Sequence, residues 1–305
     1  MIGAFEEVLG LVTRAARTIA RPLALPRGVP VVTVGGSTFG GSGKTRLALA
    51  CASMLGERGA RVVLVGHAYR ARPGHARIVA PGDALAIVGD EALACARVLA
   101  ARGLARVRVV VAERRQSAVD FAAAMDDRPD VIVIDGPAQL APERAALSLL
   151  ALDAHAPWSR GWDLRAPRAA LVAATDHRVF VDAAPEREGR VALASGRTVV
   201  LDELAGLRVG LFTALARPDR LVRGLARRGV APRVTVHAAD HGPLRVGERR
   251  RLAGAAGDVD LWLATPKCAT HLDSAELVAP LAILEDALRV PPSVARALAA
   301  LSRKE

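Results

Sequence analysis

The chain has 305 residues, of which 51% are hydrophobic, so it can bury one large core or two modest ones and is not an intrinsically disordered protein. Its net charge is +11 and 39 of its 42 basic residues are arginine, which indicates either an arginine coding bias or attraction to an anionic partner, while 3% aromatic residues argue against a base-stacking nucleic-acid surface. Three distant cysteines exclude a disulfide framework or a cysteine zinc site, and no apolar run is long enough to predict a membrane-spanning helix.

Residues 1–28 are predicted to form an amphipathic helix. Apolar residues recur at helical spacing from Ile2 to Ile19, while Arg14, Arg17 and Arg21 lie toward its far end. Such a helix suits an anionic membrane surface, where basic side chains reach lipid headgroups. It equally suits an ordinary helix that covers the core, and the pattern alone favours this commoner case.

From residue 29 to residue 165, short apolar strands alternate with helices. Strands are predicted at 31–34, 61–65, 107–111, 131–135 and 147–152, and helices at 44–58, 90–102 and 115–125. This alternation is typical of a mostly parallel sheet with helices on both faces, as in P-loop NTPases. The predicted fold class is therefore α/β.

Residues 166–305 are predicted to form a second, smaller α/β domain. A loop or crossover over 157–168, rich in tryptophan, glycine and proline, leads into it. Strands are predicted at 208–212, 234–236 and 261–264, and helices at 218–228 and 245–256. Two such units predict a ligand cleft between them.

The strongest signal is the glycine-rich loop between the strand at 31–34 and the helix that begins at Lys44. Glycine lets the chain turn so that backbone N–H groups converge on a triphosphate, and the helix adds its positive end. Lys44 is predicted to reach the β- and γ-phosphates, and the Thr45 hydroxyl to bind Mg²⁺. The predicted nucleotide-binding residues are Thr38, Phe39, Gly40, Gly41, Ser42, Gly43, Lys44 and Thr45, with Thr38 where the strict pattern has glycine.

Carboxylates near the loop are candidates for magnesium binding and proton transfer. Asp135 ends the strand at 131–135, at the sheet edge where ligands collect, and is a candidate magnesium ligand. Asp90 and Glu91 open a helix, where an aspartate serves as well for capping as for catalysis. His241 follows a short strand in the second domain, and a lone histidine there is more often structural than catalytic.

In this order the motifs resemble the tetraacyldisaccharide 4'-kinase family, which phosphorylates a disaccharide lipid in lipid A biosynthesis. The matching segments are 36–45, 88–91, 211–219, 240–241 and 265–267. The resemblance implies ATP and Mg²⁺ as cofactors and transfer of the γ-phosphate to the 4'-hydroxyl of a tetraacyldisaccharide 1-phosphate. It also implies a lipid A precursor and an anionic membrane surface as partners, no nucleic acid, and a peripheral or monotopic place on the cytoplasmic face of the bacterial inner membrane.

The same resemblance implies roles for individual residues. Asp90 is expected to be the general base, His241 its orienting partner, and Lys44 the third catalytic residue. The expected magnesium and phosphate residues are Thr45, Glu91, Asp135 and Gln139.

Some segments depart from the family pattern. Gly136 and Leu140 stand where the family has a second aspartate and a histidine, and 66–70 replaces a Ser-Arg-Gly-Tyr-Gly segment. These departures leave open a degenerate nucleotide-binding paralogue with a regulatory or binding role. The excess of basic residues leaves open a further alternative, a soluble P-loop enzyme that acts on a small anionic metabolite.

Overall fold

The computed structural model describes most of the chain beyond the predicted N-terminal helix. The described residues are 22–136, 138–139, 143–158, 164–184, 189–241, 244–255, 257–273, 277–285 and 288–302. Residues 1–21 lie outside them, so the amphipathic helix stays a prediction there. Residues 22–28 are described and form no helix, so the predicted end at residue 28 was wrong. Within the described part, no helix is both long enough and apolar enough to cross a membrane.

Seven strands form the larger sheet, in the order β3-β4-β2-β5-β1-β6-β7. They are β1 (Val31–Gly36), β2 (Val62–Val65), β3 (Arg77–Ile78), β4 (Val107–Val111), β5 (Val131–Asp135), β6 (Leu147–Asp153) and β7 (His177–Val181). All neighbours run parallel except β3 and β4. The central strands are buried on both faces, which is why they read as runs of valine, isoleucine and leucine.

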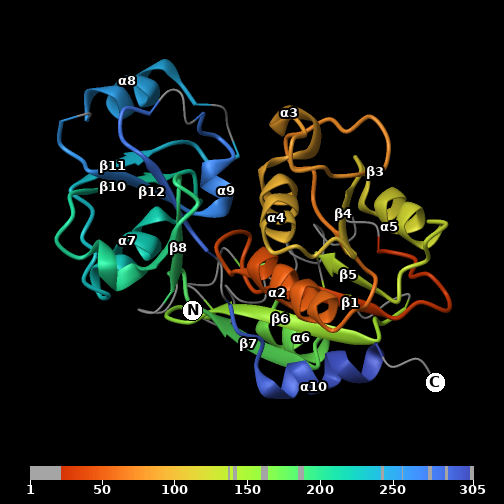
Figure 1. Ribbon diagram of the computed structural model, residues 1–305. Coiled ribbons are helices and arrows are strands. Elements are labelled where there is room, and N and C mark those ends of the chain that lie inside the picture. Colours follow the sequence, from red (N-terminus) through yellow and green to blue (C-terminus); the bar gives the residue numbers. More distant parts are fainter. Residues whose placement is uncertain are drawn as a thin grey trace.

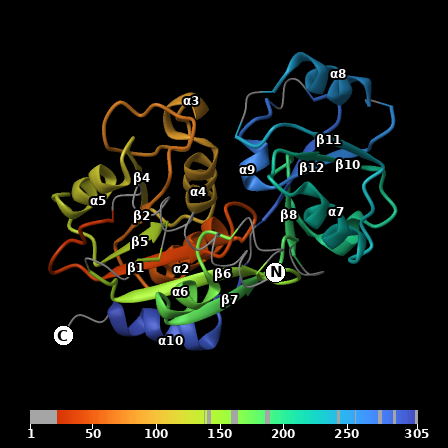
Figure 2. The same ribbon diagram turned by 180° about the vertical axis from the view of Figure 1, so that it is seen from behind.

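Helices cover both faces of this sheet and with it form the N-terminal lobe (Figures 1 and 2). They are α2 (Lys44–Glu57), α3 (Leu85–Val88), α4 (Asp90–Ala101), α5 (Arg115–Ala123), α6 (Arg168–Ala173) and α10 (Pro292–Leu301). The apolar faces of α2, α4 and α10 share one core cluster with one face of the sheet. On the opposite face, α5 and α6 pack against the alternate strand residues.

A second sheet, in the order β11-β10-β12-β13-β8-β9, forms the C-terminal lobe. Its strands are β8 (Arg190–Leu193), β9 (Thr198–Val200), β10 (Val209–Thr213), β11 (Val234–His237), β12 (Leu261–Ala264) and β13 (Leu281–Leu284). Its helices are α7 (Pro218–Ala226), α8 (Val246–Gly254), α9 (Pro266–Ala269) and the 3-10 turn η1 (Leu201–Leu204). Here α7 covers one face, and α8 and α9 cover the other.

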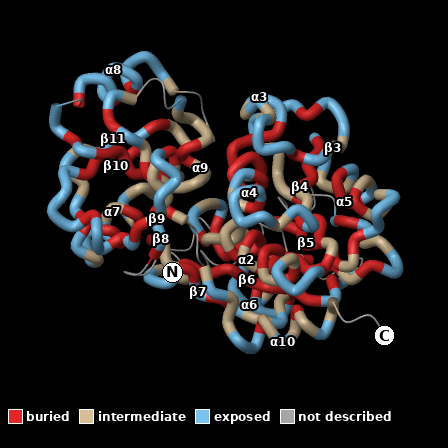
Figure 3. The backbone as a smooth tube through the Cα atoms, in the orientation of Figure 1, coloured by how far each residue is buried: buried red, intermediate tan, exposed pale blue. Residues whose placement is uncertain are grey.

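The buried strands run through the middle of both lobes, and exposed segments surround them (Figure 3). The lobes meet where α4 packs against α9. The expected α/β class, with mostly parallel sheets, is confirmed. The predicted domain division at residue 165 stays a prediction; the first sheet continues to Val181, and α10 packs against α2.

Candidate active site

The phosphate loop (residues 37–43) joins β1 to α2 at the carboxyl edge of the first sheet. Gly43 has φ +81°, and a Cβ atom there would lie 2.5 Å from Cγ1 of Val181, so both the backbone and the packing require glycine. Among its helical residues, α2 has no acidic side chain in its first turn and no side-chain N-cap. Its first N–H groups can therefore bind an anion.

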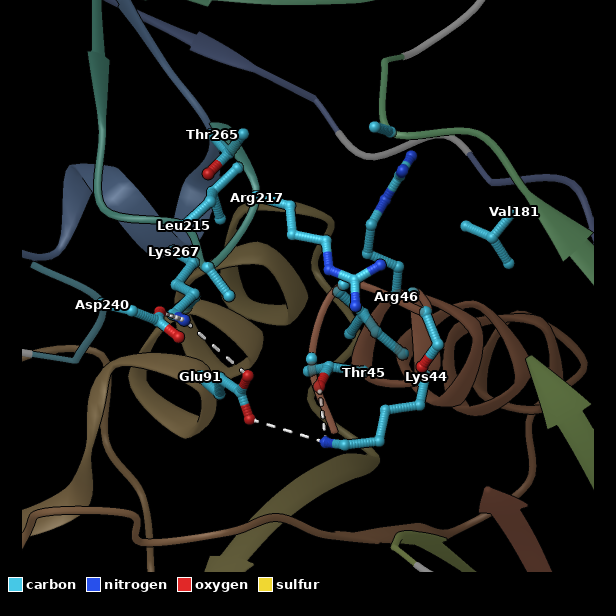
Figure 4. Close-up of a pocket in the computed structure, with 18 of the residues that line it drawn as sticks. Lys44, Thr45, Arg46, Glu91, Val181, Leu215, Arg217, Asp240, Thr265 and Lys267 are labelled. Carbon is cyan, nitrogen blue, oxygen red and sulfur yellow. Dashed lines mark hydrogen bonds and ion pairs between the residues drawn. The ribbon is translucent and has the colours of Figure 1, made fainter. Parts of the chain in front are cut away.

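A cavity of about 620 Å³ opens over this loop between the two lobes. The N-terminal lobe contributes the loop and Glu91 of α4 to its wall. The C-terminal lobe contributes the segments 215–217, 240–241, 265–267 and 284–285, together with Arg220. Figure 4 shows a line of alternating charge across the cavity, from Lys44 through Glu91 and Lys267 to Asp240, with separations of 3.8, 3.9 and 2.6 Å.

At the base of the loop, Lys44 and Thr45 both contact the carboxylate of Asp135. Lys44 Nζ donates to Oδ1 at 3.0 Å, and the Thr45 hydroxyl donates to Oδ2 at 2.6 Å. Burial lowers the pKa of Lys44, but Asp135 and Glu91 outweigh it, so that pKa is raised. Burial raises the pKa of Asp135, but Lys44 and Thr45 hold it below its usual range. Both groups are therefore charged at neutral pH.

Asp90, at the first position of α4, is held by side chains from the other lobe. Its Oδ1 lies 2.8 Å from His241 Nδ1, and its Oδ2 lies 3.2 Å from His271 Nε2 and 3.6 Å from Lys267 Nζ. Burial raises the pKa of Asp90, but the two histidines and Lys267 outweigh it and hold the pKa well below its usual range. An ionised carboxylate accepts only, so each histidine donates to it.

His241 is the member of this pair that faces the cavity, whereas Asp90 does not line it. Its backbone has φ +59°, a conformation uncommon for a residue other than glycine. The Tyr69 ring stands edge-on at 4.9 Å, and Lys267 Nζ lies 3.3 Å from His241 Nε2. Since lysine donates, Nε2 accepts. Nδ1 therefore carries the ring proton and donates it in the hydrogen bond to Asp90.

The structure brings together all the predicted site residues except Gln139. The Gln139 amide nitrogen donates to the carbonyls of Leu23 and Glu143, and its oxygen accepts the N–H of Leu23. All three contacts are to backbone, and Gln139 does not line the cavity. It therefore fixes the segment that precedes β1, and the geometry gives the expected magnesium role no support.

Oxygen donors suited to magnesium remain at the loop. Thr45, Asp135 and Glu91 supply a hydroxyl and two carboxylates, the hard ligands that Mg²⁺ prefers. The described residues contain no group of three or more His, Cys, Asp or Glu side chains arranged to hold a metal alone.

The sequence alone indicated no role for His271 or Lys267. It also indicated none for two arginines of the cavity, Arg115 and Arg165. The sequence does offer a signal for Lys267, because it is, like Lys44, one of only three lysines in this arginine-rich chain. His271 follows it by four residues and carries no motif. Burial lowers the pKa of Arg115 and of Arg165, which both line the cavity and leave it rich in positive charge.

Comparisons with known proteins point in one direction. The LpxK family, described as tetraacyldisaccharide-1-P 4'-kinase, matches residues 5–302. The tetraacyldisaccharide 4'-kinase of Methylobacterium sp. (strain 4-46) is 33% identical over 290 residues, which cover 88% of this chain and 82% of that protein. The enzyme of the same name from Nitrobacter winogradskyi is 33% identical over 269 residues, which cover 82% and 77%.

A solved structure shares the fold. The crystal structure of LpxK from Aquifex aeolicus in complex with ATP matches with a TM-score of 0.65 and covers 98% of this chain and 96% of that one. The sequence identity is 19%, so this likeness concerns the fold alone.

Proposed function

The chain belongs to the LpxK family of tetraacyldisaccharide-1-P 4'-kinases, and on this premise we propose that it transfers the γ-phosphate of ATP to the 4'-hydroxyl of a tetraacyldisaccharide 1-phosphate in lipid A biosynthesis. One observation carries the proposal. The phosphate loop and the Asp90–His241 pair lie at the same interlobe cavity. Phosphoryl transfer needs a polyphosphate site beside an acceptor site, because positioning and charge stabilisation supply most of its catalysis.

We assign the nucleotide to the phosphate loop. The backbone N–H groups of residues 38–45 and the start of α2 bind the phosphates, and Lys44 reaches the β- and γ-phosphates. Asp135 keeps the Lys44 ammonium charged and pointed at the loop. Arg115 and Arg165 add positive charge on the same wall, where phosphoryl oxygens gain negative charge during transfer.

Magnesium is assigned to Thr45, Asp135 and Glu91. Their oxygens fit the ion, whereas the Gln139 oxygen already accepts a backbone N–H. A bound Mg²⁺ would neutralise part of the negative charge of the phosphates. The residues around it hold that site in place, because the Thr45 hydroxyl is fixed by its hydrogen bond to Asp135.

The Asp90–His241 pair is assigned to the proton of the 4'-hydroxyl. His241 lines the cavity, and its Nε2 would take the hydroxyl proton after giving up its contact with Lys267 Nζ, because this nitrogen has one lone pair. Asp90 would stabilise the positive charge that the ring then gains. His271 fixes the second oxygen of Asp90, so the carboxylate cannot rotate away from His241. The proton of the 4'-hydroxyl would thus pass to His241, while Asp90 remains the anion of the pair.

A lipid substrate supports a place for the enzyme at a membrane surface. We propose peripheral attachment to the cytoplasmic face of the inner membrane through the part of the predicted amphipathic helix that lies within residues 1–21. The net charge of +11 supports this, since anionic lipids attract basic segments.

A second candidate function is nucleotide binding without turnover. Gly136 stands where the family has a second aspartate, and a Cβ atom there would lie 3.1 Å from Nε of Arg115. Arg115 therefore occupies the space beside the phosphate loop where another carboxylate would stand. A cation at that place favours phosphate binding but supplies no magnesium ligand.

One assay separates the two candidates. Full-length protein in detergent is incubated with Mg²⁺, tetraacyldisaccharide 1-phosphate and ATP labelled in its γ-phosphate, with Lys44→Ala as the inactive control. Label in the lipid supports the kinase. ATP binding with no labelled lipid rejects the kinase and leaves the nucleotide-binding protein.

A further inference from the structure

Arg220 of α7 reaches across from the C-terminal lobe to the phosphate loop. Its Nη1 donates to the carbonyl of Gly41 at 3.0 Å and to Oδ2 of Asp153 at 2.8 Å. The side chains of Arg220 and Asp153 are 14% and 4% exposed, so this ion pair is largely shielded from water. Charged hydrogen bonds of this kind are stronger than neutral ones.

Asp153 is a rigid anchor for that arginine. It ends β6, the neighbour of the strand β1 that leads into the loop. Its other oxygen, Oδ1, accepts the N–H groups of His155 at 3.0 Å and Ala156 at 2.6 Å. The carboxylate is therefore fixed to the sheet that carries the loop, while the guanidinium comes from the other lobe.

The contact with Gly41 sets the direction of a peptide. In a trans peptide the C=O and the following N–H point in opposite directions. When Arg220 holds the Gly41 carbonyl, the N–H of Ser42 must point away from that guanidinium. Ser42 lies in the loop directly before Gly43 and Lys44, where amide direction decides phosphate binding.

The backbone of the phosphate loop is not restricted to one conformation at Gly41. Gly41 has φ +73°, and glycine moves between positive and negative φ at little cost. A Cβ atom there would lie 3.3 Å from Cδ of Arg217 and 3.4 Å from Nη1 of Arg220, so the start of α7 packs directly on this glycine. External contacts must therefore hold the peptide.

Two other carbonyls of the loop are held in the same way. Arg165 Nε donates to the Thr38 carbonyl at 2.8 Å, and the Thr38 hydroxyl donates to the Gly40 carbonyl at 2.7 Å. Of these donors, only Arg220 belongs to the C-terminal lobe.

We propose that Arg220, anchored by Asp153, is a positioning residue that orients the Gly41–Ser42 peptide for phosphate binding and so makes nucleotide affinity depend on the C-terminal lobe. The inference rests on the proposed assignment of ATP to this loop. By linkage, a bound nucleotide strengthens the docking of α7 on the loop by the same factor.

The test compares three single variants of the full chain. Arg220→Ala removes the contact, Asp153→Asn removes the anchor but keeps an acceptor for the N–H groups of 155 and 156, and Arg223→Ala is a matched control on the exposed side of α7. The dissociation constant for Mg·ATP is measured by calorimetry, and the thermal midpoint without nucleotide checks folding. We expect Arg220→Ala to weaken ATP binding about 10- to 100-fold. Asp153→Asn should weaken it in the same direction but less, and Arg223→Ala should not change it.

The KM values for ATP and for the lipid distinguish a local effect on ATP binding from a general loss of structure. Arg220→Ala should raise KM for ATP and leave KM for the lipid unchanged, and Arg220→Lys should restore part of the affinity. Unchanged ATP affinity in Arg220→Ala overturns the proposal. So does wild-type affinity in Asp153→Asn, because an arginine that touched phosphate directly would need no anchor. Calorimetry reports on binding alone, so a failure here is distinct from a failure to phosphorylate lipid.

Discussion

His241 Nδ1 lies 2.8 Å from Asp90 Oδ1, although 151 residues separate them in the chain. Asp90 begins α4 of the N-terminal lobe, and His241 lies four residues after the end of β11 in the C-terminal lobe. The hydrogen bond therefore exists only when both lobes are folded and docked. Catalysis by this pair requires the same interlobe arrangement that forms the cavity.

Replacing Asp90 with asparagine should abolish most turnover without preventing ATP binding. The amide is neutral and cannot stabilise a protonated His241, while Asp90 has no contact with the phosphate loop itself. General-base groups contribute about 10²- to 10⁴-fold, so kcat should fall by that range. Initial rates with the lipid give kcat, and calorimetry gives the ATP affinity.

The matched control for Asp90 is Asp83→Asn, in an aspartate that pairs with Arg77 on the surface of the same lobe. It should leave kcat unchanged. An Asp90→Asn enzyme with near wild-type kcat would show that the pair plays no part in proton transfer.

The sequence predicted most of the fully buried strands, because runs of branched apolar residues define them. The strands β4, β5 and β12 have the predicted bounds. The sequence missed the partly buried strands β7, β8, β9 and β13, and it also missed the two-residue strand β3. Among the helices it missed α10 and the short helices α3, α6 and α9.

From the residues alone, the site was predictable only where its chemistry is local, and the pairing of Asp90 with His241 was expected only from the family resemblance. The phosphate loop follows from adjacent residues, whereas His271 reaches Asp90 across 181 positions with no motif. Gln139 was given a magnesium role because of its place in a motif. Its partner Leu23 lies 116 residues away, and no local pattern reveals that contact.

His67 should make stability depend on pH in the mildly acidic range. Burial, followed by repulsion from Arg115 and Lys44, lowers its pKa from 6.5 to about 4. Between these values the unfolded chain binds a proton that the folded chain does not, so the free energy of unfolding falls as pH falls. The full effect is about 3 kcal/mol at most, and less for a half-buried ring.

Urea unfolding of wild type and His67→Gln at several pH values measures this. The variant should lose less stability than wild type between pH 6.5 and pH 4, the interval bounded by the two pKa values. His75→Gln, in an exposed histidine, should behave like wild type. Parallel curves for wild type and His67→Gln would contradict the lowered pKa.

Gln139→Ala should lower stability without changing the magnesium requirement. Its amide makes three hydrogen bonds to backbone at a buried position, and leaving those groups unpaired costs about 1–3 kcal/mol. Denaturant unfolding measures the loss. Thr45→Val is the contrasting variant, because it removes a proposed magnesium ligand and should raise the Mg²⁺ concentration for half-maximal activity.

Comparing the two variants distinguishes a structural role of Gln139 from a role in magnesium binding. If Gln139→Ala shifts the Mg²⁺ dependence as Thr45→Val does, the residue acts on the ion and its backbone contacts are secondary. A shift in Thr45→Val alone supports the structural role.

Lys44→Arg should inactivate the enzyme, although 39 other positions of this chain use arginine as the cation. The Lys44 ammonium fits between Asp135 Oδ1 at 3.0 Å and the Thr45 hydroxyl at 3.3 Å, close enough to Arg165 for the two positive charges to repel. A planar guanidinium is larger, and its fork would displace either Asp135 or the phosphates. A displacement of about 1 Å at a reacting group costs about 10²-fold, so kcat/KM for ATP should fall by at least that factor.

Arg58→Lys, just after the far end of α2, is the control and should keep full activity. Wild-type kcat/KM in Lys44→Arg would mean that this site needs positive charge but not a compact ammonium, and the geometric account of the phosphate loop would have to be abandoned.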